Sequence, residues 1–208
     1  MSHAITILSA DDHPLMREGI ASVLASASDL RLVAQASDGE EAVQLYRKYL
    51  PEVTLLDVQM PGRSGIDALI DIRKEFPEAR IIMLTMFRGD VQVRRALRAG
   101  ASGYLLKNML QDGLQQTIRL VHAGKHYIPP EIAYELTSST LGEELSEAEV
   151  KVLKLVAAGQ TNKAVARTLE IPEETVKTRM KSILAKLSAN DRTHAVTVAI
   201  RRGIIEME

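Results

Sequence analysis

The stretch Val53-Thr54-Leu55-Leu56-Asp57-Val58-Gln59-Met60-Pro61-Gly62 decides the fold of this 208-residue chain. A mainly apolar run, 53–56, leads directly into an acid, and Pro61-Gly62 then marks a turn. A short apolar run bounded by turn residues is typical of a strand that is buried on both faces of a parallel sheet. We therefore expect Asp57 on the rim of such a sheet, at the end of its strand.

Polar side chains also follow three other apolar runs. These runs, with the residues that follow them, are 5–8 with Asp11 and Asp12, 81–84 with Thr85, and 104–106 with Lys107. Because ligands of open parallel sheets bind beyond the carboxyl ends of the strands, we expect these side chains to share one site. Three carboxylates, one hydroxyl and one ammonium could hold a divalent cation and a phosphoryl group.

The fold class expected is α/β followed by all-α. Residues 1–127 alternate short apolar runs with amphipathic stretches, which predicts a doubly wound (βα)5 parallel sheet. Its strands are expected near 4–10, 31–35, 53–57, 80–85 and 102–106. Residues 128–143 contain Pro129-Pro130 and the run Thr137-Ser138-Ser139-Thr140, so they are expected to form a linker, with a possible short helix at 131–136.

Residues 144–208 give no strand signal and form the second expected domain. Four helices are predicted, near 146–158, 161–169, 173–187 and 191–202. Ser146 with Glu149 forms a capping-box pattern, and Asp191 suits the N-cap of the last helix. The short break at 170–172 between the two middle helices is typical of a helix-turn-helix.

Composition favours a cytoplasmic protein without a membrane partner. The chain has no Cys, which excludes disulfides and thiolate metal sites. It has no apolar stretch of the roughly 18 residues that span a bilayer, and its first residues lack a secretory pattern. With a net charge of −1, charge alone does not predict a binding partner, so the placement of basic residues must decide.

The acidic rim suggests Mg²⁺ and an aspartyl nucleophile. Converging carboxylates repel one another unless a cation lies among them, and hard oxygen ligands favour Mg²⁺. Asp57 could then attack a phosphorus atom, with Lys107 and Thr85 neutralising the phosphoryl oxygens. A lone Asp at a strand end is more often a helix cap, but chance does not readily produce the joint pattern. A phosphatase that uses an aspartyl nucleophile would need a second Asp where Gln59 stands, so turnover of phosphate esters is disfavoured.

The helix 173–187 carries the second chemical signal. Val176, Met180 and Ile183 lie on its expected buried stripe. Lys177, Thr178 and Lys181 share the opposite side, on a segment with four basic residues and no acid between 175 and 187. A solvated basic face is the ordinary explanation of such a pattern. The preceding helix-turn break instead favours a recognition helix in the major groove of double-stranded DNA.

Residues 4–122 resemble the receiver domain of two-component response regulators. The matching residues are Asp11, Asp12, Asp57 with 60–62 behind it, Thr85 and Lys107. The resemblance implies that a sensor histidine kinase phosphorylates Asp57, and that Mg²⁺ is held by Asp12, Asp11, Asp57 and the backbone carbonyl of Gln59. Tyr104 matches the switch aromatic of the family, which turns inward when Thr85 moves toward the phosphate.

Residues 145–205 resemble the LuxR-type DNA-binding domain, and the pair of domains marks the NarL/FixJ type of response regulator. By that resemblance Lys177, Thr178 and Lys181 face base edges, whereas Asn162, Lys163 and Arg179 lie nearer phosphates. An active homodimer is expected to pair through the helix 191–202, whose Ala195, Val198 and Ala199 are small enough for close approach. The function expected is phosphorylation-controlled transcription. The alternative is a receiver protein that acts mainly through protein contacts and binds DNA weakly.

Overall fold

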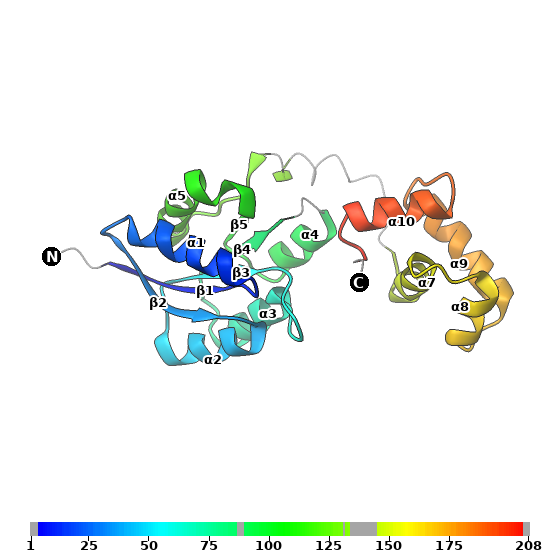
Figure 1. Cartoon of the computed structure of the whole chain (residues 1–208), viewed down its shortest axis with the longest axis horizontal. Helices are drawn as coiled ribbons and strands as arrows, with labels where there is room; N and C mark the ends of the chain where they lie inside the picture. Colours follow the sequence, from blue (N-terminus) through cyan, green and yellow to red (C-terminus); the bar gives the residue numbers. More distant parts are fainter. Residues whose placement is uncertain (1–3, 87–89, 131, 134–144, 206–208) are drawn as a thin grey trace. The chain divides into compact units, whose positions relative to one another are not determined.

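The computed structural model describes residues 4–86, 90–130, 132–133 and 145–205 (Figure 1). The chain divides into two compact units. The first, here called the sheet unit, is Met1–Met86 with Val93–Ala133, and the second, the helical unit, is Phe87–Gln92 with Tyr134–Glu208. None of the helices in the described ranges is both long and apolar enough to cross a membrane.

The sheet unit is built on five parallel strands. They are β1 (Ile5–Ala10), β2 (Leu30–Ala36), β3 (Val53–Asp57), β4 (Ile81–Thr85) and β5 (Gly103–Leu106). Their order is β2-β1-β3-β4-β5, so the strand that carries Asp57 is central. Each strand lies within one residue of its predicted position. Every residue of β3, β4 and β5 is buried, as expected of strands covered on both faces.

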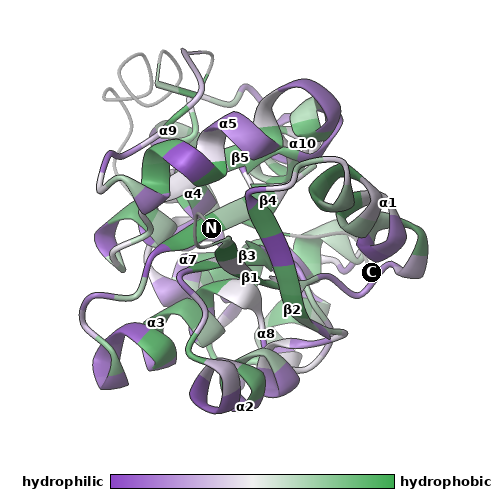
Figure 2. Ribbon diagram, turned by 90° about the vertical axis from the view of Figure 1, so that its left-hand side faces the viewer, coloured by the Kyte–Doolittle hydropathy of each residue, from purple (hydrophilic) through white to green (hydrophobic). Residues whose placement is uncertain are grey.

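Helices follow the strands in alternation. They are α1 (Pro14–Ala25), α2 (Gly39–Tyr49), α3 (Gly65–Glu75), α4 (Asp90–Arg98) and α5 (Leu110–His122), with a 3₁₀ turn, η1 (Lys107–Met109), before α5. α1 and α5 pack together against one face of the sheet, and α2 and α3 pack together on the other (Figure 1). Figure 2 shows mainly hydrophobic strands, with a hydrophilic stretch in β2, between helices of mixed hydropathy. The doubly wound arrangement predicted from the alternation is therefore confirmed.

The register of the sheet brings the strand ends level. Ala10 pairs with Leu56, Asp57 with Leu84, and Thr85 with Leu106. The residues that follow these positions consequently leave the sheet along one rim. This alignment is what places polar residues from four strands within reach of one another.

The helical unit contains α7 (Glu147–Ala157), α8 (Asn162–Thr168), α9 (Glu173–Lys186) and α10 (Arg192–Arg201). The bounds agree with the predicted helices to within one residue. Side-chain caps fix three of the starts: Ser146, Thr161 and Asp191 accept hydrogen bonds from backbone N–H groups of the first turns. Of the short helix predicted at 131–136, residues 132 and 133 are helical and the rest lies outside the described residues.

The structure corrects one set of predicted residues. Ala195, Val198 and Ala199 of α10 are 0%, 7% and 0% exposed, because they pack into the core of the helical unit. Small side chains on a helix allow close packing both inside a domain and between two copies of the chain. The sequence pattern is the same in the two cases. Since they are buried, these three residues are not available for pairing with a second copy of the chain.

Candidate functional site

Four strand ends bring the predicted side chains to one rim of the sheet. Asp11, Asp57, Thr85 and Lys107 follow or end β1, β3, β4 and β5, and all four are buried. Buried charges are costly unless they are paired or bind a cation. The concentration of ionisable groups here therefore indicates a functional site rather than a packing solution.

Lys107 bridges two of the carboxylates. Its Nζ lies 2.7 Å from Oδ2 of Asp57 and 2.8 Å from Oδ2 of Asp11. Burial acts to lower the pKa of Lys107, but the hydrogen bonds to Asp11 and Asp57 outweigh it and raise that pKa above its ordinary value. The ammonium is thus held in its charged form beside the acid that was predicted to accept phosphate.

The pKa of the Asp57 carboxyl is raised by its surroundings. Burial raises its pKa to about 6, the charge of Asp11 adds to the effect, and Lys107 opposes it. A second positive charge would therefore stabilise the ionised carboxylate further. A divalent cation among the acids would supply that charge.

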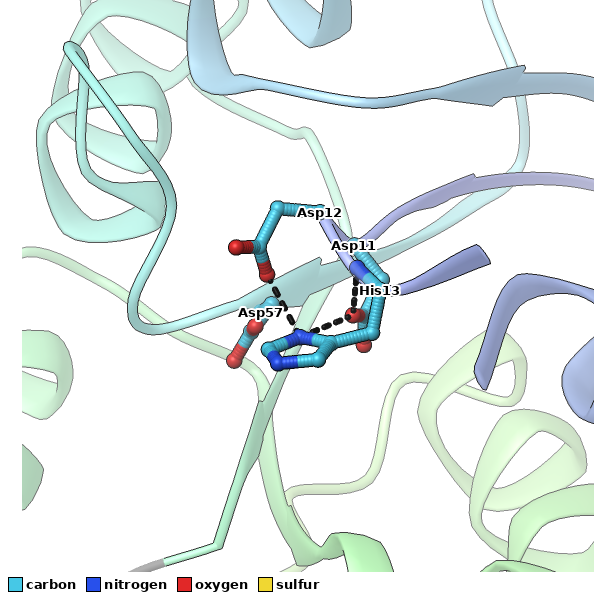
Figure 3. Close-up of side chains that lie close together, drawn as sticks. All are labelled: Asp11, Asp12, His13 and Asp57. Atoms are coloured by element: carbon cyan, nitrogen blue, oxygen red, sulfur yellow. Dashed lines mark hydrogen bonds and ion pairs between the residues drawn. The ribbon is translucent and has the colours of Figure 1, made fainter. Parts of the chain in front are cut away.

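The donor set fits such a cation. Ligand atoms of Asp11, Asp12, His13 and Asp57 all lie within 4.8 Å of one another, and three of these four residues provide hard carboxylate oxygens (Figure 3). Mg²⁺ typically takes one or two protein carboxylates and keeps several waters. Asp11, Asp12 and Asp57 could hold it. The predicted fourth ligand, the carbonyl of Gln59, lies in the loop after β3, and the N–H of this residue approaches Oδ1 of Asp57 at 3.4 Å.

His13 is a member of this cluster that sequence reasoning missed. Its Nδ1 lies 2.7 Å from Oδ1 of Asp12 and 3.4 Å from Oδ1 of Asp11 (Figure 3). The signal was present, because His13 directly follows the two acids at the end of a strand.

The loop after Asp57 depends on a glycine that was also missed. A Cβ atom on Gly65 would clash with the carbonyl oxygen of Asp57, so only glycine fits without moving the loop. The N–H of Gly65 also donates to the carbonyl of Val58 at 3.2 Å. This close approach fixes the start of α3 against the end of β3 and thereby sets the path of the residues between them.

Tyr104 lies on β5, opposite Met83 of β4, and its side chain is fully buried. Burial raises the pKa of its hydroxyl above the ordinary value, and the Thr85 side chain opposes this. The aromatic ring is thus in an inward position. Its hydroxyl is buried without a hydrogen-bond partner among the described residues.

The helical unit exposes four of the six residues predicted to contact DNA. On α9, Lys177, Thr178 and Lys181 are exposed, whereas Val176 and Met180 are buried. Lys163 on α8 is also exposed, and Asn162 and Arg179 are half-buried. Lys177 pairs with Glu174 of its own helix at 3.2 Å.

One buried acid fixes α9 against α7. Glu149 accepts hydrogen bonds from the backbone N–H of Ser146 at 2.7 Å, from Oγ of Ser182 at 2.6 Å and from Nζ of Lys186 at 2.9 Å. Burial acts to raise the pKa of Glu149, but these hydrogen bonds outweigh it and lower the pKa to about 2. Glu149 therefore both caps α7 and connects it to α9, the helix predicted to lie in the major groove.

Two family models match the chain. Residues 7–119 match the response regulator receiver domain, and residues 143–199 match the luxR family of bacterial regulatory proteins. The chain belongs to the response regulator family. This response regulator is 34% identical to the transcriptional regulatory protein DegU of Brevibacillus brevis, covering 98% of this chain and 96% of the relative. It is 38% identical to the uncharacterized transcriptional regulatory protein YxjL of Bacillus subtilis, covering 97% and 98%.

Solved structures agree with this assignment. The response regulator ChrA of a heme-sensing two-component system matches with a TM-score of 0.60 and 32% identity, covering 98% of this chain and 100% of ChrA. A structure of two RcsB dimers bound to two parallel DNAs matches with a TM-score of 0.70 and 25% identity, covering 96% and 99%. The response regulator thus combines a receiver domain with a LuxR-type DNA-binding domain, and the predicted fold class and family are confirmed.

Proposed function

We propose that Asp57 accepts a phosphoryl group from a sensor histidine kinase, with Mg²⁺ held by Asp11, Asp12, Asp57 and the carbonyl of Gln59. The observation that carries the proposal is Lys107 Nζ at 2.7 Å from Asp57 in a buried site that also contains Asp11. A buried ammonium beside a carboxylate of raised pKa leaves the site short of positive charge. A cation and a phosphoryl group would complete it.

In the proposed reaction, an oxygen of Asp57 attacks the phosphorus of a phosphohistidine. The new O–P bond forms as the P–N bond breaks, and the electron pair leaves with the imidazole nitrogen. Lys107 neutralises one phosphoryl oxygen, and the hydroxyl of Thr85 donates to another. When bound, Mg²⁺ supplies further neutralising charge. Gln59 offers no acid group to drive hydrolysis, which supports a signal rather than a turnover enzyme.

Labelling with a small phosphodonor tests the acceptor. With radiolabelled acetyl phosphate and Mg²⁺, we expect Asp57→Asn to take no label. Asp112→Asn, an exposed acid in the first turn of α5, serves as the matched control and should label as the wild type does. Labelling of Asp57→Asn at the wild-type level would disprove the assignment.

We further propose that phosphorylation controls the binding of a homodimer to double-stranded DNA through α9. Its exposed Lys177, Thr178 and Lys181 would face base edges, and Asn162, Lys163 and Arg179 would lie nearer phosphates. Support comes from the exposure of the basic face of α9 and from the similarity to RcsB dimers bound to DNA. Two half-sites about one DNA turn apart would suit a two-fold dimer.

A selected DNA fragment tests this second part. Binding is measured to a fragment that the wild type enriches from a random pool. Lys177→Ala and Lys181→Ala should each weaken binding by about 1–3 kcal/mol and relax sequence preference. Lys151→Ala, an exposed lysine on α7, is the matched control and should change binding less than twofold. Equal effects of all three variants would favour an output through protein contacts instead.

A further inference from the structure

We propose that the His13 imidazole is a ligand of the divalent cation at the acidic site. The proposal rests on the function proposed above, because it adds a nitrogen donor to the same site. Its consequence is selectivity: the site would favour first-row transition ions, which accept imidazole readily, over Mg²⁺, which prefers oxygen.

The distances around Nδ1 of His13 fit one shared ion. A transition ion lies about 2.1 Å from nitrogen and oxygen ligands, so two ligands at a right angle lie about 3.0 Å apart. The observed separations of Nδ1 from Oδ1 of Asp12 and of Asp11 are 2.7 Å and 3.4 Å. Nδ1 and the two carboxylates could therefore occupy neighbouring positions around a single cation.

Asp12 also has a vacant acceptor atom for such an ion. Its Oδ1 is buried, and no side chain or backbone group in the described ranges donates a hydrogen bond to it. Nδ1 of His13 lies at ion-pair distance from this oxygen, 2.7 Å, but without the geometry of a hydrogen bond. A cation between the two atoms would satisfy both of them.

The backbone of His13 is fixed by hydrogen bonds on both sides of the residue. Its N–H donates to Oδ1 of Asp11 at 3.0 Å, and its carbonyl accepts from the N–H groups of Met16 and Arg17 at 3.0 and 3.1 Å. Pro14 begins α1 directly after it. The backbone at this position is thus ordered before a cation binds, whereas the imidazole itself is 70% exposed. Figure 3 shows it directed at the carboxylates of Asp11 and Asp12 rather than away from them.

Cobalt provides a probe with a direct spectroscopic readout. The full chain is titrated with Co²⁺ and separately with Mg²⁺, and the Co²⁺ form is studied by proton NMR. We expect strongly shifted imidazole resonances in the wild type that vanish in His13→Ala. Affinity for Co²⁺ should fall about tenfold or more in that variant, whereas affinity for Mg²⁺ should change less than twofold.

Two further variants sharpen the test. His126→Ala, an exposed histidine after α5, should keep the shifted resonances and the Co²⁺ affinity of the wild type. His13→Asn, with a favourable N-cap residue and an oxygen donor, should keep Mg²⁺ binding and lose the imidazole signal. A wild type without shifted imidazole resonances, or His13→Ala with unchanged Co²⁺ affinity, overturns the proposal. If the wild type bound neither ion, the proposed Mg²⁺ site would be wrong as well. The labelling of Asp57 with acetyl phosphate tests the phosphoryl acceptor separately.

Discussion

Glu149→Gln tests how strongly the buried acid ties α7 to α9. Glutamine keeps the shape of the side chain and can still accept hydrogen bonds, but it lacks the charge that Lys186 pairs with. Folding lowers the pKa of Glu149 from its ordinary 4.5 to about 2. Because a tenfold change in a proton-binding constant corresponds to about 1.4 kcal/mol, this lowering stabilises the helical unit by about 3 kcal/mol at pH 7. We expect the substitution to remove most of that stabilisation.

The pH dependence gives this prediction a specific signature. The folded pKa of Glu149 lies below the unfolded one, so its stabilisation is complete above about pH 4.5 and is lost as the pH falls toward about 2. At pH 3.5, about 1.4 kcal/mol of it should already be gone. The difference between wild type and Glu149→Gln should therefore shrink to roughly half its neutral value at that pH.

Hydrogen exchange of peptides from α7 and α9 in the full chain measures the effect within the helical unit. Exchange protection is compared across a urea series at pH 7, 5 and 3.5. Glu147→Gln is the matched control, because it removes one exposed acid from the first turn of the same helix and should cost less than about 1 kcal/mol. Equal losses in the two variants, or a loss that does not change with pH, would refute the reasoning.

Three further predictions concern the phosphoryl and DNA sites. Gly65→Ala should lower the free energy of unfolding of the receiver by about 3 kcal/mol or more, because the new Cβ meets a carbonyl. Gly19→Ala, with open space around its Cβ, should raise it by about 1 kcal/mol. Calorimetry compares the two variants. Without Mg²⁺, Asp57→Asn should stabilise the receiver at pH 8 by up to about 3 kcal/mol, because the raised pKa makes the ionised acid costly above about pH 6. Thermal unfolding should show that this gain in stability vanishes near pH 4. A gain that does not change with pH would contradict the prediction. Glu174→Gln should strengthen DNA binding several-fold at low salt, because it removes the ion pair between Glu174 and Lys177. Binding titrations that show no change would oppose a DNA role for Lys177.

The elements of this response regulator were predictable because their patterns are strong and local. Short, mainly apolar runs located β3 and β4, and caps such as Ser146 and Asp191 located helix starts. The shared rim followed from one rule about parallel strands. That rule was sufficient to bring Asp57 and Lys107, 50 residues apart, into contact.

The missed features depend on distances that no pattern expresses. Gly65 is required by the approach of one carbonyl oxygen, and the placement of the His13 backbone depends on its hydrogen bond to Asp11. The residues of α10 failed for a related reason. A stripe of small side chains such as Ala195 and Ala199 indicates close packing, but only the assembled helical unit identifies the neighbour.

The two faces of α9 are subject to different constraints. Val176, Met180 and Ile183 pack into the core, and Lys186 binds Glu149, so that side is constrained by stability. Exposed Lys181 contributes nothing to that packing. If the outer face of α9 reads bases as proposed, substitutions there would alter which operator is preferred without endangering the fold, and a lineage of such regulators could acquire new target genes one residue at a time.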